Sequence, residues 1–197
     1  LKNPETYNYS GTIGRSKVLQ VTRAPGNCCM SSMSAGGPGT PETPINDNKG
    51  CGGVMRVAPI GLFPEKWNSD QVFELAMRAA AITHTHPTGY LSAGMLAAII
   101  RHQMDGIEID ESIEKSTDIL TGYRGHEETL FKVEQASDLA KGEIGSLDAV
   151  ETLGQGWIAE EALGIGIYAA LKGENYIEVI QMAANHSGDS DSTASIA

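Results

Sequence analysis

The sequence predicts an all-α protein, and three features support this fold class. Apolar residues recur at a helical spacing in several segments that follow residue 68. No segment alternates apolar and polar residues in the manner typical of a β-strand. Residues 34–53 are so rich in glycine and proline that they exclude regular structure and indicate a long functional or capping loop. We therefore expect helices with functional residues on the connections between them.

Two predicted helices follow this loop. Residues 69–84 place apolar side chains on one face, with Ser69 as the expected N-cap and Pro87 as the end of the helix. Residues 88–106 form the second helix, whose small residues allow close packing against neighbours and which ends at Gly106.

Four amphipathic segments predict further helices in the second half of the chain. Asp110 is the expected N-cap of the first, and Gly142 is the expected end of the second. The four segments are residues 110–125, 126–143, 156–173 and 174–188.

Composition places the chain with globular proteins. Its 197 residues are enough for one domain or a large piece of one, and 41% of them are hydrophobic. The net charge of -11 disfavours a nucleic-acid binder or a membrane-surface protein, and the apolar runs are too short to span a bilayer. The three cysteines lack metal-finger spacing and predict reduced thiols in the cytoplasm, with Cys28 and Cys29 equally suited to a core or a loop.

The sequence GDSDST, residues 188–193, contains two aspartates two positions apart, Asp189 and Asp191. Carboxylates grouped in this way at the start of a helix offer hard oxygen ligands for magnesium, manganese or calcium. A helix N-terminus capped by Asp or Ser explains the same residues equally well. Two other motifs fit poorly: phosphatases of the haloacid-dehalogenase type have D-x-D-x-T after a buried strand, and an EF-hand needs glycine where Ala194 stands.

A second candidate segment is NKGCGGVMRVAPIGL, residues 48–62, in which glycines precede an apolar run that predicts the start of a helix. Glycines leave backbone N–H groups free to approach an anion such as phosphate, although a tight turn explains them as well. Neither the Walker nor the Rossmann glycine pattern is present. Lys49 and Arg56 either add positive charge here or are a solvated and a salt-bridged residue.

Three more side chains are candidates for chemistry. His84 and His86 in THTHPTGYLSAG give a weak metal signal, and a histidine that binds ribose or phosphate, or that caps a helix, fits better. Glu161 shares a stripe of its predicted helix with Trp157 and Ile165. It is either an acid tied to an active-site loop or a rim carboxylate, and the second interpretation is slightly favoured.

Five segments, taken in order, resemble the ADP-ribosylglycohydrolase family, the group related to dinitrogenase reductase-activating glycohydrolase and to ADP-ribosyl-acceptor hydrolases. They are RAPGNCCMSSM, NKGCGGVMRVAPIGLF, THTHPTGYLSAG, LGQGWIAEEALGIGIYAAL and ANHSGDSDSTASIA. The resemblance extends over nearly the whole chain. It implies one partial domain, residues 1–197, with the multi-helix orthogonal bundle of this family.

The resemblance also implies a function. Members hydrolyse the glycosidic bond between ADP-ribose and an acceptor, a protein side chain or a small molecule, with two Mg²⁺ or Mn²⁺ ions. Asp189 and Asp191 would be catalytic carboxylates that bind metal together with Ser192, which stands where the family commonly has threonine. His84 would lie near the adenosine. The phosphate and ribose pocket would be lined by Cys51, Gly52, Gly53 and Val54.

The sequence departs from the family near its ends. A Gly-Asp-rich first helix and a Thr-Asp-Asp segment, which supply the other half of the metal site, are not found, and neither is a helix after STASIA. The opening LKNPETYNYS also lacks an initiator methionine, so we expect a fragment that binds metal weakly and turns over little substrate alone. A non-catalytic ADP-ribose or nucleotide binder is the alternative, and a structural protein is a third. Clustered acids that repel one another without a cation favour the enzyme.

Overall fold

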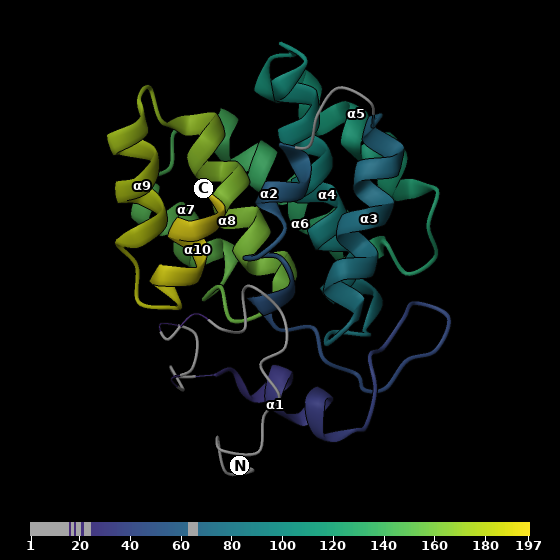
Figure 1. The fold of residues 1–197 in the computed structure, drawn as a ribbon. Coiled ribbons are helices and arrows are strands. Elements are labelled where there is room, and N and C mark those ends of the chain that lie inside the picture. Colours follow the sequence, from purple (N-terminus) through teal and green to yellow (C-terminus); the bar gives the residue numbers. More distant parts are fainter. Residues whose placement is uncertain (1–15, 17, 19–20, 22–24, 63–66) are drawn as a thin grey trace.

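The structure is a computed structural model, and it describes residues 16, 18, 21, 25–62 and 67–197. Over these residues the chain forms ten α-helices, one short 3-10 helix and no strand beyond an isolated bridge between Gly50 and Ile158 (Figure 1). The predicted all-α fold class is confirmed. The elements are α1 (Asn27–Ser34), η3 (Cys51–Gly53), α2 (Ala58–Gly61), α3 (Ser69–Ala81), α4 (Pro87–Met104), α5 (Ile109–Thr121), α6 (Glu127–Lys141), α7 (Ser146–Leu153), α8 (Ala159–Lys172), α9 (Tyr176–Ala184) and α10 (Ser190–Ile196).

Two helices, α4 and α8, form the centre of the bundle. Every residue of α4 from Thr88 to Ile99 is buried, as is every residue of α8 from Ala162 to Ala169. A helix that is buried on all sides needs neighbours on all sides. Accordingly, α4 packs against α2, α3 and α5, while α8 packs against α6, α9 and α10, and the two central helices contact each other. Figure 1 shows α3, α4 and α5 on one side of the bundle and α7 to α10 on the other.

Small residues permit this packing, as the sequence predicted for the second helix. A β-carbon added to Gly94 of α4 would lie 2.6 Å from the Phe73 ring of α3. One added to Gly166 of α8 would lie 2.8 Å from a methyl group of Ile196 in α10. Because real β-carbons do not approach so closely, larger residues at these positions would push the helices apart.

Three predicted helix boundaries were wrong. Asn68, rather than Ser69, caps α3, because its side chain accepts the backbone N–H of Gln71 in a reciprocal capping box. Pro87 does not end α3, which stops at Ala81; it occupies the first turn of α4, where a missing N–H costs nothing. Asp110 lies in the first turn of α5, and Glu108 holds the N-cap position.

Other boundaries and elements agree with the sequence only in part. The expected ends of helices at Gly106 and Gly142 are confirmed within two residues. The helices α1 and α7 were not predicted, and α1 contains Cys28 and Cys29. The opening LKNPETYNYS lies outside the described residues. Among the helices that are described, none combines the length and apolar character that crossing a membrane requires.

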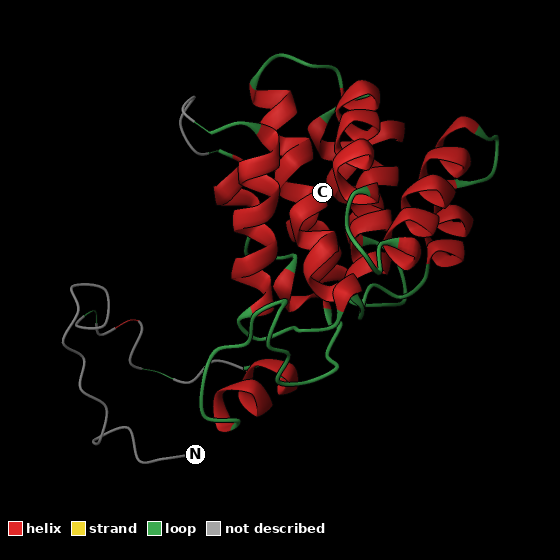
Figure 2. Cartoon of the chain, turned by 90° about the vertical axis from the view of Figure 1, so that its right-hand side faces the viewer, coloured by secondary structure: helices red, strands yellow, loops and turns green. Residues whose placement is uncertain are grey.

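One end of the bundle gathers the segments that contain most of the candidate residues. Figure 2 shows α1 and the long loops at this end, set apart from the packed helices. Ser32 of α1 donates a hydrogen bond to the carbonyl oxygen of Thr83, 2.6 Å away, and receives one from Asn46. The 3-10 helix η3 packs against α3, α4 and α8. The glycine-rich loop therefore ends between the central helices and α1.

Candidate active site

A cavity of about 730 Å³ lies where these segments meet. Its lining residues come from 26–29 at the start of α1, from 50–56 in and after the glycine turn, and from 189–192 at the start of α10, together with His84 and Trp157. These segments are far apart in the sequence. Only the tertiary fold brings them to one place.

The glycine turn is attached to the start of α8 by backbone hydrogen bonds. The N–H of Cys51 donates to the carbonyl oxygen of Trp157 at 3.1 Å, and the N–H of Ala159 donates to that of Lys49 at 2.8 Å. These bonds flank the bridge between Gly50 and Ile158. The backbone around Gly50 is thus paired as in a short strand. The N–H groups that follow, at the start of η3, have no acceptor within that helix.

The Lys49 side chain fixes the same turn to two helices. Its Nζ lies 2.7 Å from Glu128 Oε2 on α6 and 2.7 Å from Glu160 Oε1 on α8. Thr88 at the start of α4 donates to the same Glu128 oxygen, also at 2.7 Å. The Glu160 side chain is only 7% exposed, and its second oxygen is buried without a hydrogen-bond partner. Lys49 is therefore a salt-bridged anchor rather than a cation facing the cavity.

His84 forms one wall of the cavity and is almost fully buried, at 1% exposure. Thr83 Oγ1 accepts a hydrogen bond from Arg56 and lies 2.8 Å from His84 Nδ1. We assign the hydroxyl proton to Nδ1, because no other acceptor for it is found among the described residues, and the ring proton then lies on Nε2. Burial, and to a lesser extent the charge of Arg56, lower the pKa of His84 to about 4. At neutral pH the ring is an uncharged donor beside Gly52.

Asp189 is tied to the glycine turn through side chains. Its Oδ2 accepts a hydrogen bond from Ser192 Oγ at 2.8 Å and lies 3.2 Å from Cys51 Sγ. Burial raises the pKa of Cys51 to about 11, so at neutral pH the thiol keeps its proton and donates it. Asp191 lies on the same turn, exposed and lining the cavity.

The loop between α7 and α8 positions the backbone of this aspartate turn. Asp189 N–H donates to the Gln155 carbonyl oxygen at 2.7 Å, and a β-carbon on Gly188 would lie only 2.0 Å from that oxygen. Glu161 Oε2 accepts the N–H groups of Gln155 and Gly156, both at 3.1 Å. Glu161 is therefore tied to a loop beside Asp189, which is the interpretation that the sequence had slightly disfavoured.

Comparison with known proteins identifies the scaffold. Residues 9–197 match the family described as ADP-ribosylglycohydrolase. The chain belongs to the ADP-ribosylglycohydrolase family. It is also similar to an uncharacterized protein from Archaeoglobus fulgidus, with 28% identity over 147 residues. That match covers 74% of this chain and 46% of the relative, so the chain spans about half the length of the curated relative that it matches.

In this member of the ADP-ribosylglycohydrolase family, most of the residues singled out from the sequence line one cavity. They are Cys51, Gly52, His84, Asp189, Asp191 and Ser192. Gly53 and Val54 do not line it. Gly53 packs against Ala80, and the Val54 side chain is fully buried in the hydrophobic core. His86 caps α4 by accepting the N–H of Thr88, as one interpretation of the motif suggested.

Several residues of the cavity wall were not among the predicted site residues, although Arg56 had been considered as a source of positive charge. Arg56 lines it while its guanidinium caps the carbonyl oxygens of Ala79 and Ala80 at the end of α3. The start of α1, residues 26–29, forms another wall, and RAPGNCCMSSM was the signal for it. Trp157 stands at the rim and is more than half exposed.

The donor atoms at the start of α10 fit part of a divalent-cation site. The two carboxylates and the Ser192 hydroxyl are hard oxygen ligands, which magnesium and manganese prefer. Within residues 25–62 and 67–197, no group of three or more His, Cys, Asp or Glu side chains is arranged to hold a metal ion. Asp189, Asp191 and Ser192 would therefore supply only part of a coordination shell, and water or substrate oxygens would have to complete it.

Proposed function

We propose that this chain is the ADP-ribose-binding part of a glycohydrolase that cleaves the bond between ADP-ribose and an acceptor, a protein side chain or a small molecule. The main support is the convergence of the glycine turn, His84 and the aspartate turn on one cavity, in a chain that belongs to this family. The cavity volume of about 730 Å³ lies in the range typical of small-molecule sites.

Each wall of the cavity has a proposed role. Gly50 and Gly52 lack side chains, so a phosphate can approach the backbone N–H groups of the turn. Arg56 is the one Lys or Arg side chain on the described wall, and it adds a positive charge beside that turn. The neutral His84 ring donates from Nε2 to a ribose or phosphate oxygen. Of the proposed pocket residues, Gly53 and Val54 support the turn from behind.

Asp189, Asp191 and Ser192 would bind Mg²⁺ or Mn²⁺, and the proposed full centre holds two ions. Cations held by these residues would supply a template for the distal ribose and an activated water. Ser192 and Cys51 hold one oxygen of Asp189 in place, which leaves the remaining carboxylate oxygens for ligation. Positive charge develops on the ribose as the glycosidic bond breaks, and the two carboxylates lie on the wall that would face it.

A second candidate is a binder of ADP-ribose or a related nucleotide without catalysis. The hydrogen bonds from Ser192 and Cys51 to Asp189 favour it, because they satisfy this carboxylate without a cation. The two candidates share the glycine turn and differ in whether ligand binding requires the metal.

The test is a titration of ADP-ribose followed by the fluorescence of Trp157. The chain has two tryptophans, so the Trp67→Phe variant reports on the cavity rim alone. We expect ADP-ribose to change this fluorescence, with an affinity at least about tenfold higher when Mg²⁺ is present. Calorimetry under the same conditions measures the same affinities without a fluorophore.

The matched variant combines Asp189→Ala with Asp191→Ala. Loss of the Mg²⁺ dependence in this variant supports the hydrolase, and a binding affinity indifferent to both Mg²⁺ and the substitutions supports the non-catalytic binder. No change of fluorescence or heat with ADP-ribose in any variant contradicts both. The thermal unfolding midpoint of each variant is measured first, so that unfolding of the variant is not mistaken for a loss of ligand binding.

A further inference from the structure

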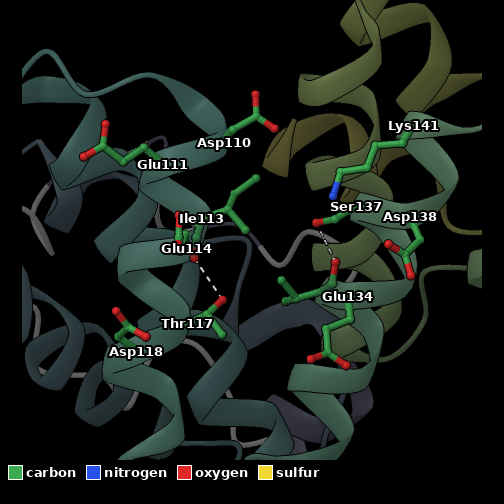
Figure 3. A pocket seen from close by; sticks show the side chains of 11 residues that line it. Asp110, Glu111, Ile113, Glu114, Thr117, Asp118, Glu134, Ser137, Asp138 and Lys141 are labelled. Carbon is green, nitrogen blue, oxygen red and sulfur yellow. Dashed lines mark hydrogen bonds between the residues drawn. The ribbon is translucent and has the colours of Figure 1, made fainter.

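A groove of about 890 Å³ runs between α5 and α6, on residues that the candidate active site does not use. It exists because α5 packs mainly against α4, whereas α6 packs mainly against α8, and the two contact each other only weakly. Figure 3 shows side chains from both helices along its walls. The acidic ones are Asp110, Glu111, Glu114, Asp118, Glu134 and Asp138.

The groove is strongly negative. All six carboxylates are on exposed residues, and Lys141 is the one cationic residue in the wall. Glu111 forms an ion pair with Lys115 at 3.3 Å, and the other five form none with any residue that the structure describes. Carboxylates of one sign gathered in a concave surface create a potential that attracts cations.

A smaller apolar groove of about 530 Å³ adjoins it along α6. It is lined by Phe131, Leu139 and Ile144, and Glu134 and Asp138 belong to the walls of both grooves. Phe131 is 61% exposed. A large aromatic side chain left in water beside other apolar groups is typical of a surface that is covered by a partner.

We propose that the two grooves together dock a cationic amphipathic segment of a partner protein. Its apolar side chains would cover Phe131 and Ile144, and its lysines or arginines would lie along the shared ridge of Glu134 and Asp138. Charge complementarity favours a cationic partner protein over the other molecules that could bind here. A second copy of this chain would bring the same acidic face against itself, and nucleic acids and anionic membranes would be repelled.

This surface and the candidate active site have no lining residue in common, so a partner and a small ligand can bind at the same time. The docking surface goes beyond the proposed function and does not depend on it. Its failure or success is also measured without ADP-ribose or metal.

The probe is a fluorescent synthetic peptide of about 14 residues, with leucine and lysine at amphipathic helical spacing. Anisotropy at about 0.15 M ionic strength measures its binding to the chain. We expect saturable binding that Glu134→Gln plus Asp138→Asn weakens by about tenfold, and that Phe131→Ser weakens by a similar factor. A control peptide in which glutamate replaces lysine should not bind.

The matched control for charge is Asp70→Asn plus Glu174→Gln, which removes two exposed acids from other helices and loops. It should change the affinity less than about twofold. Equal weakening by the two charge pairs means diffuse attraction to an acidic protein and overturns the proposal. An affinity for the peptide that is unchanged in Phe131→Ser also overturns it. The same holds if the chain self-associates and Phe131→Ser abolishes the self-association, or if the chain binds phosphatidylserine vesicles and not the peptide.

Discussion

His84 is the residue whose chemistry depends most on its surroundings. The ring is buried beside Gly52, accepts the Thr83 hydroxyl proton at Nδ1, and faces the charge of Arg56 through that same hydroxyl. Burial disfavours the protonated ring, and the nearby charge of Arg56 disfavours it further, which is why the pKa is low. The neutral ring is thus a built-in donor, and it cannot serve as a general acid near neutral pH.

This low pKa predicts a pH dependence of stability. Between pH 6.5 and about 4, the unfolded chain binds a proton at His84 and the folded chain does not, so stability falls as the pH falls through this window. The expected loss of stability between pH 7 and pH 4.5 is about 2 kcal/mol, from the free energy that corresponds to one pKa unit. Urea unfolding at several pH values measures it.

His84→Gln is the control for this prediction, because glutamine does not titrate. Acids with lowered pKa values, such as Asp105 and Glu151, also stabilise the folded protein less as the pH falls. Because this loss is the same in both proteins, it cancels in the comparison. The free-energy difference between pH 7 and pH 4.5 should be smaller in the variant by about 2 kcal/mol. Parallel pH profiles for the two proteins would contradict the assignment.

At the scale of elements, the glycine turn is stable because helices that are distant in sequence hold it. Lys49 reaches the first turns of α6 and α8. The backbone on either side of Gly50 pairs with Trp157 and Ala159 at the start of α8. Carboxylates in the first turn of a helix are favoured by its dipole. Lys49 joins two such carboxylates, so one side chain connects the loop to the ends of both helices.

Replacing this anchor should destabilise the fold. Lys49→Met leaves Glu160 buried without its counter-ion, which costs about 3 kcal/mol in comparable buried pairs. The control is Lys115→Met, which breaks the exposed pair with Glu111 and should cost less than about 1 kcal/mol. Urea unfolding of both variants provides the comparison.

The double variant Lys49→Met plus Glu160→Gln tests the physical reason. If the unpaired buried charge causes the loss, removing that charge should restore part of the stability. Equal losses in Lys49→Met and Lys115→Met, or no recovery in the double variant, would show that Lys49 acts through packing or not at all.

At the scale of the whole molecule, stability is distributed unevenly. The core residues of α4 and α8 are inaccessible to solvent, whereas α1 lies outside the bundle, with Ser32 as its one buried residue (Figure 2). Elements with few buried apolar contacts open at low free-energy cost. The cavity is therefore bounded by a rigid wall of helices and by a first helix that opens more easily.

Hydrogen exchange tests this difference. Amides of residues 30–34 in α1 should exchange at least about 100-fold faster than those of residues 91–99 in α4. Because α1 contributes to the cavity, saturating ADP-ribose should slow exchange in α1 and leave α4 unchanged. Equal protection of the two helices without ligand would contradict the uneven distribution.

The sequence predicted the long elements better than the short ones. Helices of thirteen residues or more, such as α3 and α4, repeat the apolar spacing over several turns, and their existence was predicted. The eight residues of α1 and of α7 give only about two turns, too few for a recognisable period. Cap positions were misassigned where neighbouring residues can both cap, as with Asn68 and Ser69.

The sequence by itself determined the helical fold class, the irregular loop before the glycine turn, and the family through motifs in a fixed order. Only the tertiary structure decided that Cys51 lies beside Asp189, 138 positions away, and that Lys49 pairs with Glu160, 111 positions away. The physical reason is that periodicity and turn chemistry act over a few residues. Contacts between distant residues depend on how whole helices pack, and that packing is set by the shape of the entire core.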